Sequence, residues 1–401
     1  MTSDRTAQQA GIAAETERKN SSVLVSGASF AGLATAFWMN KLGYKVTIVE
    51  AAKGLKKGGT PVNIGDEAAD IAKRMGLLEQ IQANRLKMEG VELKNSDDVT
   101  AGPLQLPPTA VSSEVDWEIE RDTLLDLMFD AVKDDVEFVF NNSTETLDET
   151  QNDVRVSFKD GSQRSFDLIF GCDGTHSRIR KLRFGDESEY MHFLGQYFSI
   201  TIVDELLIKE NTTQMYNEPG KVVMLNAYNK KTDVVLCFSS EKEIPYDYRD
   251  EEQQRSIIFE QFAGQGWRTP ELLEKVRNST SFYFDRVCQI KMPSWTKGRV
   301  ALVGDAAYCA SPAAGMGGSL AIIGAAALAD AFQKHHGNFK LAFQDYNESF
   351  RPYVEEVQAN AANNLDTLVP QTEEAIHKRN MQPKFFGEEK CTSSSADFEA
   401  S

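Results

Sequence analysis

The stretch VLVSGASFAG, residues 23–32, leads an apolar segment directly into a turn of small residues and glycine. The apolar LATAFWM follows this turn, and YKVTIVE, which ends in Glu50, comes next. These patterns predict a buried strand over 23–27, a helix over 30–42 and a second strand over 45–50. The order strand, tight turn, helix, strand is typical of a helix-covered parallel sheet, so we expect an α/β fold.

The turn has the spacing Gly27-x-Ser29-x-x-Gly32, and Glu50 follows about 20 residues later. A helix N-terminus directs free N–H groups at one point, where they bind a pyrophosphate that small residues allow to come close. An acid at this distance accepts a hydrogen bond from a ribose hydroxyl. The pattern predicts a site for FAD or NAD, and a tight turn without a ligand is the alternative. Ser29 replaces the glycine of the fingerprint and fits if its φ is negative.

The composition limits the other classes of function. The chain has 401 residues, 41% of them hydrophobic, and a formal net charge of −17. This charge opposes binding to nucleic acids or to anionic membranes. Residues 1–20 lack the apolar segment of a signal peptide, and Asp305 and Pro312 interrupt the apolar stretch 301–332, so we expect no membrane span. Five scattered cysteines without a CxxC or Cys/His cluster indicate neither a disulfide framework nor a metal site, which favours the cytoplasm.

The pattern changes after residue 186. FLGQYFSITIV, KVVMLNA and DVVLCFS alternate in polarity and predict an antiparallel sheet over 186–280. GRVALVGDAA, residues 298–307, returns to a buried strand, and GSLAIIGAAALADAF predicts a buried helix. The region 339–379 is helical, and Pro352 and Pro370 should break or kink it.

Three further segments carry a family resemblance. DLIFGCDGTHSRIR (167–180), RVALVGDAAYCASPAAGMGGSLA (299–321) and EIERDTLLDLM resemble fingerprints of class A flavin monooxygenases, the para-hydroxybenzoate hydroxylase-like family. The matching residues are Asp173, Gly174, Ser177 and Arg180, then Gly304, Asp305, Pro312, Gly315 and Gly317, and Arg121. VLVSGASFAGLATAFWM, KKGGTPVNI and FYFDRVCQIKMPSWTKGRVALVGDAAYC look most like the tetracycline-inactivating members, the tetracycline destructases. Ser319 departs from the asparagine of many members.

The resemblance implies a Rossmann-like FAD-binding domain with an inserted antiparallel-sheet substrate domain and a C-terminal helix. The expected division is a discontinuous FAD-binding domain (21–92, 112–185 and 281–338), a substrate domain (93–111 and 186–280), a helical region (339–380) and flexible tails (1–20 and 381–401). We expect a monomer.

The same resemblance implies the FAD contacts. They are Gly27, Ser29, Phe30, Ala31, Gly32, Glu50, Ala51, Gly59, Arg121, Asp173, Asp305, Gly315, Gly317 and Gly318. Asp305 would bind flavin hydroxyls, because a buried aspartate costs several kcal/mol unless it is hydrogen-bonded; an N-cap is the alternative. Arg121 would reach the FAD, unless it is a surface arginine. Asp173 and Arg180 could equally form an architectural ion pair. His176 is expected to be structural.

The implied enzyme is an FAD- and NADPH-dependent monooxygenase that transfers one oxygen atom from O2 to an aromatic or polyketide-like molecule. Tetracycline is the most specific substrate that the resemblance suggests. The flavin carries the chemistry, so we assign no catalytic residue. The candidates for the substrate pocket are Pro312, Tyr197, Ser199 and Met224, although the strand residues could also face solvent. The alternatives are a hydroxylase of another aromatic compound and a flavin- or drug-binding protein without turnover.

Overall fold

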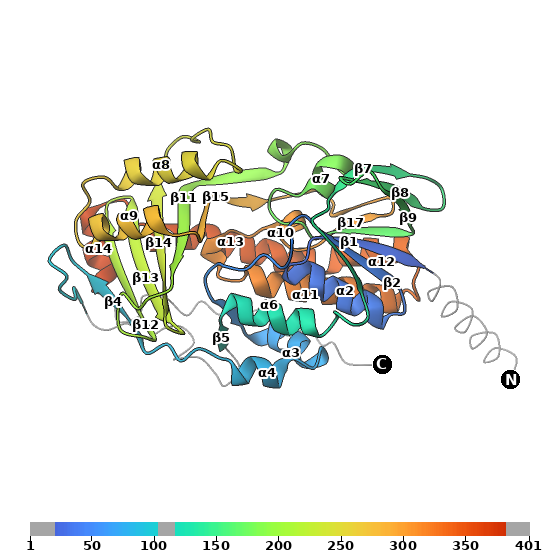
Figure 1. Cartoon of the computed structure of the whole chain (residues 1–401), viewed down its shortest axis with the longest axis horizontal. Coiled ribbons are helices and arrows are strands. Elements are labelled where there is room, and N and C mark those ends of the chain that lie inside the picture. The colour runs from blue at the N-terminus through green and yellow to red at the C-terminus, as the bar shows by residue number, and fades with distance from the viewer. Residues whose placement is uncertain (1–20, 103–116, 382–401) are drawn as a thin grey trace, which may run out of the picture.

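The computed structural model describes residues 21–102 and 117–381. It forms two lobes side by side along the long axis of the molecule (Figure 1). Both lobes contain helices and strands, and the first is built around a mainly parallel sheet, which confirms the predicted α/β class. Over the described ranges, no helix has the length and apolar character needed to cross a membrane.

The first lobe holds a six-stranded sheet in the order β16-β17-β10-β1-β2-β6. Its strands are β1 (Ser22–Ser26), β2 (Lys45–Glu50), β6 (Glu137–Phe140), β10 (Leu168–Gly171), β16 (Thr296–Lys297) and β17 (Val300–Leu302). All its pairs are parallel except β16 with β17. The helices α2 (Phe30–Lys41) and α11 (Gly317–Lys334) pack against each other beside it. The predicted strand–turn–helix–strand unit is confirmed.

Shorter elements complete this lobe. They are β3 (Val62–Ile64), α3 (Asp66–Arg74), α4 (Leu78–Ala83), β5 (Trp117–Ile119), α6 (Arg121–Asp130), β7 (Thr144–Glu149), β8 (Val154–Phe158), β9 (Gln163–Phe166), α7 (Arg178–Arg183), η1 (Glu187–Glu189), α10 (Asp305–Tyr308) and η2 (Pro312–Ala314). The predicted hairpin around Asp160 and Gly161 joins β8 to β9. Its second arm ends at Phe166, and the chain then enters the main sheet as β10.

The second lobe is a six-stranded sheet in the order β15-β11-β14-β13-β12-β4. Its strands are β4 (Gly90–Lys94), β11 (Met191–Val203), β12 (Thr212–Glu218), β13 (Lys221–Tyr228), β14 (Lys231–Ser239) and β15 (Phe282–Ile290). The sheet is antiparallel, as predicted, apart from the parallel pair β12–β4. The helices α8 (Glu251–Phe262) and α9 (Thr269–Asn278) cover one of its faces and share a core with it.

Two segments that the predicted division places in the FAD-binding domain pair with this second sheet. β4 begins at Gly90, before the expected boundary at 92, and β15 occupies 282–290, after the expected boundary at 280. Both strands lie at edges of the sheet. A single strand's pattern does not reveal its partner, because strand pairing is a contact between distant segments.

The described part of the chain then continues with the helices α12 (Phe339–Ser349), α13 (Arg351–Leu368) and α14 (Glu373–Asn380). Pro352 stands in the first turn of α13, and Pro370 lies between α13 and α14. Both prolines therefore separate helices, as predicted, because a proline is tolerated at a helix start and not inside it. α13 packs against η2 of the first lobe, and α14 contacts β12 of the second.

Candidate active site

The glycine turn after β1 is too tight for side chains at its ends. Gly27 has a φ of +105°, and a Cβ there would lie 2.4 Å from the carbonyl oxygen of Cys172. A Cβ on Gly32 would lie 1.9 Å from the carbonyl oxygen of Gly27. Ser29 has a φ of −97°, so a serine fits, and its hydroxyl accepts a hydrogen bond from Arg121 Nη2 at 3.2 Å. Within the described residues, no side chain caps α2, which leaves its first N–H groups available to a ligand.

Glu50 closes this turn from the end of β2. Its Oε2 accepts from the backbone N–H of Ala28 at 2.9 Å, and its Oε1 accepts from that of Ala52 at 2.8 Å. A carboxylate has about four acceptor positions, so capacity remains for a ribose hydroxyl. The neighbouring Ala51 is exposed. The structure thus places the predicted acid beside the predicted turn.

Arg121, the first residue of α6, joins the turn to the loop after β2. Its Nη1 donates to the carbonyl oxygens of Lys56 and Gly58 at 3.1 and 2.9 Å. Its guanidinium lies 5.2 Å from the centre of the Phe30 ring. Gly59 has a φ of +102°, and a Cβ there would lie 2.9 Å from Arg121 Cδ. Arg121 is therefore an ordered part of the site, and not the surface arginine of the alternative.

Asp305 enters the site from the end of β17. Burial raises the pKa of its carboxyl to about 6, although the thiol of Cys309 and the charge of Arg121 act to lower it. Gly304 precedes it with a φ of +67°, and a Cβ there would lie 2.8 Å from the Cβ of Ala31. The N-cap of α10 is Gly304 and not Asp305. This rules out the N-cap alternative, and the residue as a whole is half-buried, so the desolvated carboxyl can still accept from a hydroxyl donor.

The N-terminus of α11 faces open space. A Cβ added to Gly315 or Gly317 would meet no atom of the described residues within 4 Å, and one on Gly318 would lie 3.4 Å from the Phe30 ring. Met316, the N-cap, makes no side-chain capping bond to described atoms. An uncapped helix N-terminus stabilises negative charge in front of it.

Ser319, the departure from the family pattern, has a defined role. Its hydroxyl donates to the backbone carbonyl oxygen of Asn63 at 2.7 Å. This bond ties the first turn of α11 to β3, which also packs on α11. The serine therefore fixes the helix start from the side of β3.

Asp173 is committed to the architecture. Its Oδ1 accepts from the hydroxyl of Ser177 at 2.5 Å, and its Oδ2 accepts from the N–H groups of Arg178 and Ile179 at 2.8 and 3.1 Å. These bonds hold the start of α7, which gives Asp173 a structural role, and its contact with FAD stays a prediction. The alternative of an architectural Asp173–Arg180 ion pair is not observed, because the buried guanidinium of Arg180 pairs with Glu187 at 3.2 Å instead.

His176 bridges the two lobes. Its Nδ1 lies 3.1 Å from Glu187 Oε1, and its Nε2 lies 3.2 Å from Asp285 Oδ2 on β15. Burial lowers the pKa of His176, but the hydrogen bonds and charges of Asp285 and Glu187 outweigh it and raise the pKa to about 9. The imidazole is therefore positively charged at neutral pH, in agreement with the predicted structural role.

Two predicted pocket residues lie on the wrong face of the second sheet. Tyr197 and Ser199 are fully buried on the face that α8 and α9 cover, and the Tyr197 hydroxyl accepts from the N–H of Ile244 at 2.7 Å. The sequence alternation is correct, but the helices cover the face expected to meet substrate. Tyr197 and Ser199 are therefore withdrawn as pocket residues.

The opposite face approaches the loop around Gly58. Ile202 Cδ1 would lie 3.8 Å from a Cβ added to Gly58, and Ile200 and Met224 both pair with Val235 on this face. Met224 packs against a cluster on this face that includes Val369, at the end of α13, and it stays a predicted pocket residue. Pro312 is exposed in η2, directly before the open space at α11.

The sequence reasoning missed Tyr283. It lies on the edge strand β15 with its ring 5.6 Å from that of Phe198, and Lys56 Nζ lies 5.9 Å from its ring centre. Its hydroxyl donates to Asp285 at 3.0 Å, and the residue is 40% exposed. The alternating polarity of FYFDRVCQI could have indicated this strand, but the predicted boundary at 281 assigned it to the FAD-binding domain.

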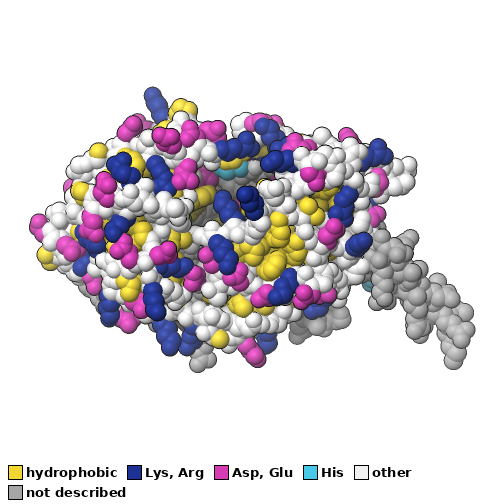
Figure 2. Space-filling view, viewed as in Figure 1, with side chains coloured by type: hydrophobic (Ala, Val, Ile, Leu, Met, Phe, Trp, Pro, Cys, Tyr) yellow, Lys and Arg dark blue, Asp and Glu magenta, His cyan; other side chains and the backbone are white. Residues whose placement is uncertain are grey.

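Figure 2 shows a hollow between the lobes with Lys and Arg along its rim and an apolar patch beside it.

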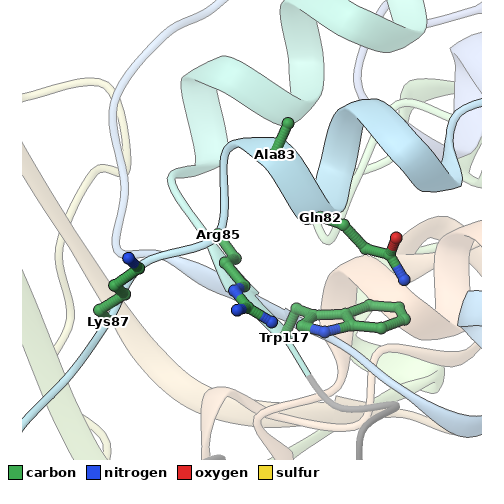
Figure 3. Close-up of a pocket in the computed structure, with 5 residues that line it drawn as sticks. All are labelled: Gln82, Ala83, Arg85, Lys87 and Trp117. Carbon is green, nitrogen blue, oxygen red and sulfur yellow. The ribbon is translucent and has the colours of Figure 1, made fainter.

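A separate cavity of about 500 Å³ lies between α4 and the start of β5 (Figure 3). Gln82, Ala83, Arg85, Lys87 and Trp117 line it. None of the predicted flavin or substrate residues is among them, so it is distinct from the site between the lobes.

A family comparison agrees with this geometry. A model of the family described as FAD binding domain matches residues 20–359. The chain belongs to this family. It is a flavin-dependent monooxygenase, and its curated relatives include a flavin-dependent monooxygenase of Legionella longbeachae serogroup 1, 32% identical over 338 residues that cover 84% of this chain and 87% of the relative. An uncharacterised protein of Mycobacterium tuberculosis (strain H37Rv) is 35% identical over 367 residues, 89% of this chain and 96% of the relative.

Solved structures place this monooxygenase near one branch of the family. The crystal structure of tetracycline destructase Tet(51) matches with a TM-score of 0.80 and 34% identity, covering 90% of this chain and 94% of that one. Klebsiella pneumoniae HpxO, solved with FAD and uric acid, matches with a TM-score of 0.72 at 19% identity over 90% and 92% of the two chains. The second match shows the shared fold alone.

Proposed function

We propose that FAD lies across the two glycine-rich turns, with its pyrophosphate at the uncapped start of α2. Glu50 accepts from the adenosine ribose, and Asp305 accepts from hydroxyls nearer the flavin. Arg121 holds the loop over the cofactor through Gly58. These roles use polar groups that already converge in the structure, and a Cβ on Gly317 would meet no described atom within 4 Å.

When bound, FAD would supply the redox and oxygen-transfer chemistry, with NADPH as the reductant and O2 as the source of the oxygen atom. The chain's own residues bind and orient the partners. The N-terminus of α11 faces the flavin and stabilises negative charge there. Lys56, whose Nζ lies 5.9 Å from the Tyr283 ring centre, supplies a positive charge that attracts the negatively charged NADPH to a protein whose net charge is −17.

We propose an aromatic or polyketide-like substrate in the space between the two lobes, and tetracycline as the first compound to test. The observation that carries this proposal is the aromatic and aliphatic face made by Phe198, Ile200, Met224 and Tyr283, on the side of the sheet where Ile202 approaches the loop around Gly58. A flat molecule with polar edges suits such a face, because aromatic rings stack well. The similarity to Tet(51) supports tetracycline within this class.

The test is NADPH consumption by the purified, FAD-loaded protein in air, with and without tetracycline, while mass spectrometry follows the drug. We expect tetracycline to stimulate consumption and to gain one oxygen atom. NADH in place of NADPH tests the reductant, and a FAD-free preparation is the control.

Consumption that tetracycline leaves unchanged, with the drug intact, would contradict tetracycline as substrate. Stimulation by other aromatic compounds under the same conditions would then identify a hydroxylase with a different specificity. FAD binding without any NADPH oxidation would contradict the catalytic proposal and favour a binding protein.

A further inference from the structure

The loop between α10 and η2 holds an unusual backbone conformation. Cys309, Ala310 and Ser311 are buried, and Ser311 has a φ of +90° and a ψ of 148°. This conformation lies next to the region that glycine alone adopts readily, and a non-glycine residue there costs about 1–3 kcal/mol unless its surroundings hold it. The loop leads directly through Pro312 into the open space before α11.

Two buried glutamines hold this loop from different elements. Gln358 of α13 donates from Nε2 to the carbonyl oxygens of Cys309 at 3.1 Å and Ile290 at 2.9 Å. Gln289 of β15 donates from Nε2 to the carbonyl oxygens of Ala310 at 3.2 Å and Gln358 at 2.6 Å. The exposed fractions of Gln358 and Gln289 are 5% and 0%.

The orientation of both amides follows from their partners. Each Nε2 faces two carbonyl oxygens, so a flipped amide would place oxygen against oxygen. Only a side chain that donates two hydrogen bonds satisfies this arrangement. A buried carbonyl that loses its donor is costly, which makes the loop sensitive to these two residues.

We propose that Gln358, supported by Gln289, is a positioning residue that keeps the Cys309–Ser311 loop in the conformation needed to receive the flavin. The inference rests on the proposed FAD site. Neither glutamine touches that site directly: they hold the backbone carbonyls of Cys309 and Ala310, and the chain then runs through Ser311 into η2. Through these two glutamines, β15 of the second sheet and the helix α13 both hold the Cys309–Ser311 loop.

The first test compares FAD affinity, measured by quenching of flavin fluorescence, in Gln358→Met and Gln358→Glu. Both keep the length of the side chain and remove its paired donors. We expect FAD binding to weaken about 10-fold in each, the size expected for the loss of two buried hydrogen bonds. Gln289→Met, which acts from the other element, is expected to weaken it less. Glu355→Gln, on the same helix and 63% exposed, is the control and should bind FAD normally.

The second test asks whether the effect passes through the strained residue. Ser311→Gly removes the cost of the positive φ, so it should restore most of the affinity lost in Gln358→Met. Hydrogen exchange of residues 309–318 in the FAD-free protein should be faster in Gln358→Met and slower again in the double variant. This second readout does not depend on FAD, so it stands if the proposed cofactor site fails.

Three results would overturn the proposal. The first is FAD affinity within twofold of the wild type in both Gln358 variants. The second is a loss of FAD affinity in Gln358→Met that Ser311→Gly does not reduce, which would show a general loss of packing. The third is unchanged exchange of residues 309–318 in Gln358→Met.

Discussion

Glu50 ends β2 and Asp305 begins the helix that follows β17 in the same sheet, yet the two acids have opposite roles before any ligand binds. Both oxygens of Glu50 accept backbone N–H groups, so this acid builds its own turn. Burial dominates at Asp305 and raises its pKa to about 6. Glu50 therefore stabilises the folded chain, whereas Asp305 is held at a cost that a hydroxyl-bearing ligand would offset. Stability without FAD and affinity for FAD should respond differently at the two ends.

The largest contrast is between the glycines of the two turns. Gly27→Ala places a Cβ 2.4 Å from a backbone oxygen at a φ of +105°. We expect it to lower the free energy of unfolding by about 3 kcal/mol or more and to abolish FAD binding. In Gly317→Ala the Cβ meets open space, so thermal stability should be unchanged or slightly higher while FAD binds about 10-fold more weakly.

Thermal unfolding of the FAD-free proteins and FAD titration measure the two effects. Equal loss of stability in the two variants would contradict the distinction between a packed turn and an open one.

Asp305→Asn should separate affinity from stability. Loss of the charged acceptor should weaken FAD binding about 10- to 100-fold, because hydrogen bonds to a charged group are strong. The folded pKa of about 6 lies above the ordinary 3.8, so the native state holds a proton that the unfolded state releases, and stability falls as pH rises between these values. Asparagine does not titrate, so the variant does not lose stability as the pH rises through this range.

The FAD-free Asp305→Asn protein should therefore have a higher Tm than the wild type at and above pH 6, and the same Tm near pH 4. A Tm below that of the wild type at pH 7 would refute the view that Asp305 is held at a cost.

Glu50→Gln should move stability in the other direction. The NH2 group of the glutamine would face the backbone N–H of Ala28 or Ala52. The variant would therefore lose one charge-assisted hydrogen bond. We expect a loss of about 1–2 kcal/mol in the FAD-free protein at neutral pH, with FAD binding weakened several-fold as a consequence. Chemical denaturation with and without FAD checks both, and an unchanged midpoint without FAD would show that Glu50 serves the ligand alone.

Ser29→Gly, which restores the family residue, should have the smallest effect. The φ of Ser29 is negative, so glycine is not required, and the substitution removes the hydrogen bond that the hydroxyl accepts from Arg121. We expect FAD affinity within about threefold of the wild type, in line with one partly exposed hydrogen bond. A tenfold gain in a FAD titration would mean that the hydroxyl obstructs the phosphate.

The features that the sequence predicted correctly are mostly local. The turn from Gly27 to Gly32, its acid Glu50 and the buried α11 each depend on residues close in the chain, where spacing determines geometry. The α/β class and the flavin-dependent monooxygenase family were recognisable for the same reason, because their fingerprints are short runs.

The second sheet shows where this reasoning stops. Alternation separated Phe198 from Tyr197 and Ser199 correctly, but a period of two does not state which face a distant helix covers. The exposed Tyr283 was missed for a related reason, since its strand pairs with β11, which lies far away in the sequence. The partner of Arg180 is likewise Glu187 and not the motif residue Asp173.

The glycine turns, the acids that follow the strands and the family can all be read from the amino-acid order. They depend on backbone conformation and spacing over a few residues, which the side chains of those residues dictate. Three properties required the folded chain: which face of the second sheet the helices cover, which acid is bonded and which is buried at a cost, and how Gln289 and Gln358 reach the Ser311 loop. Those properties arise from burial and from contacts between segments far apart in the chain, whose free energies no local pattern records.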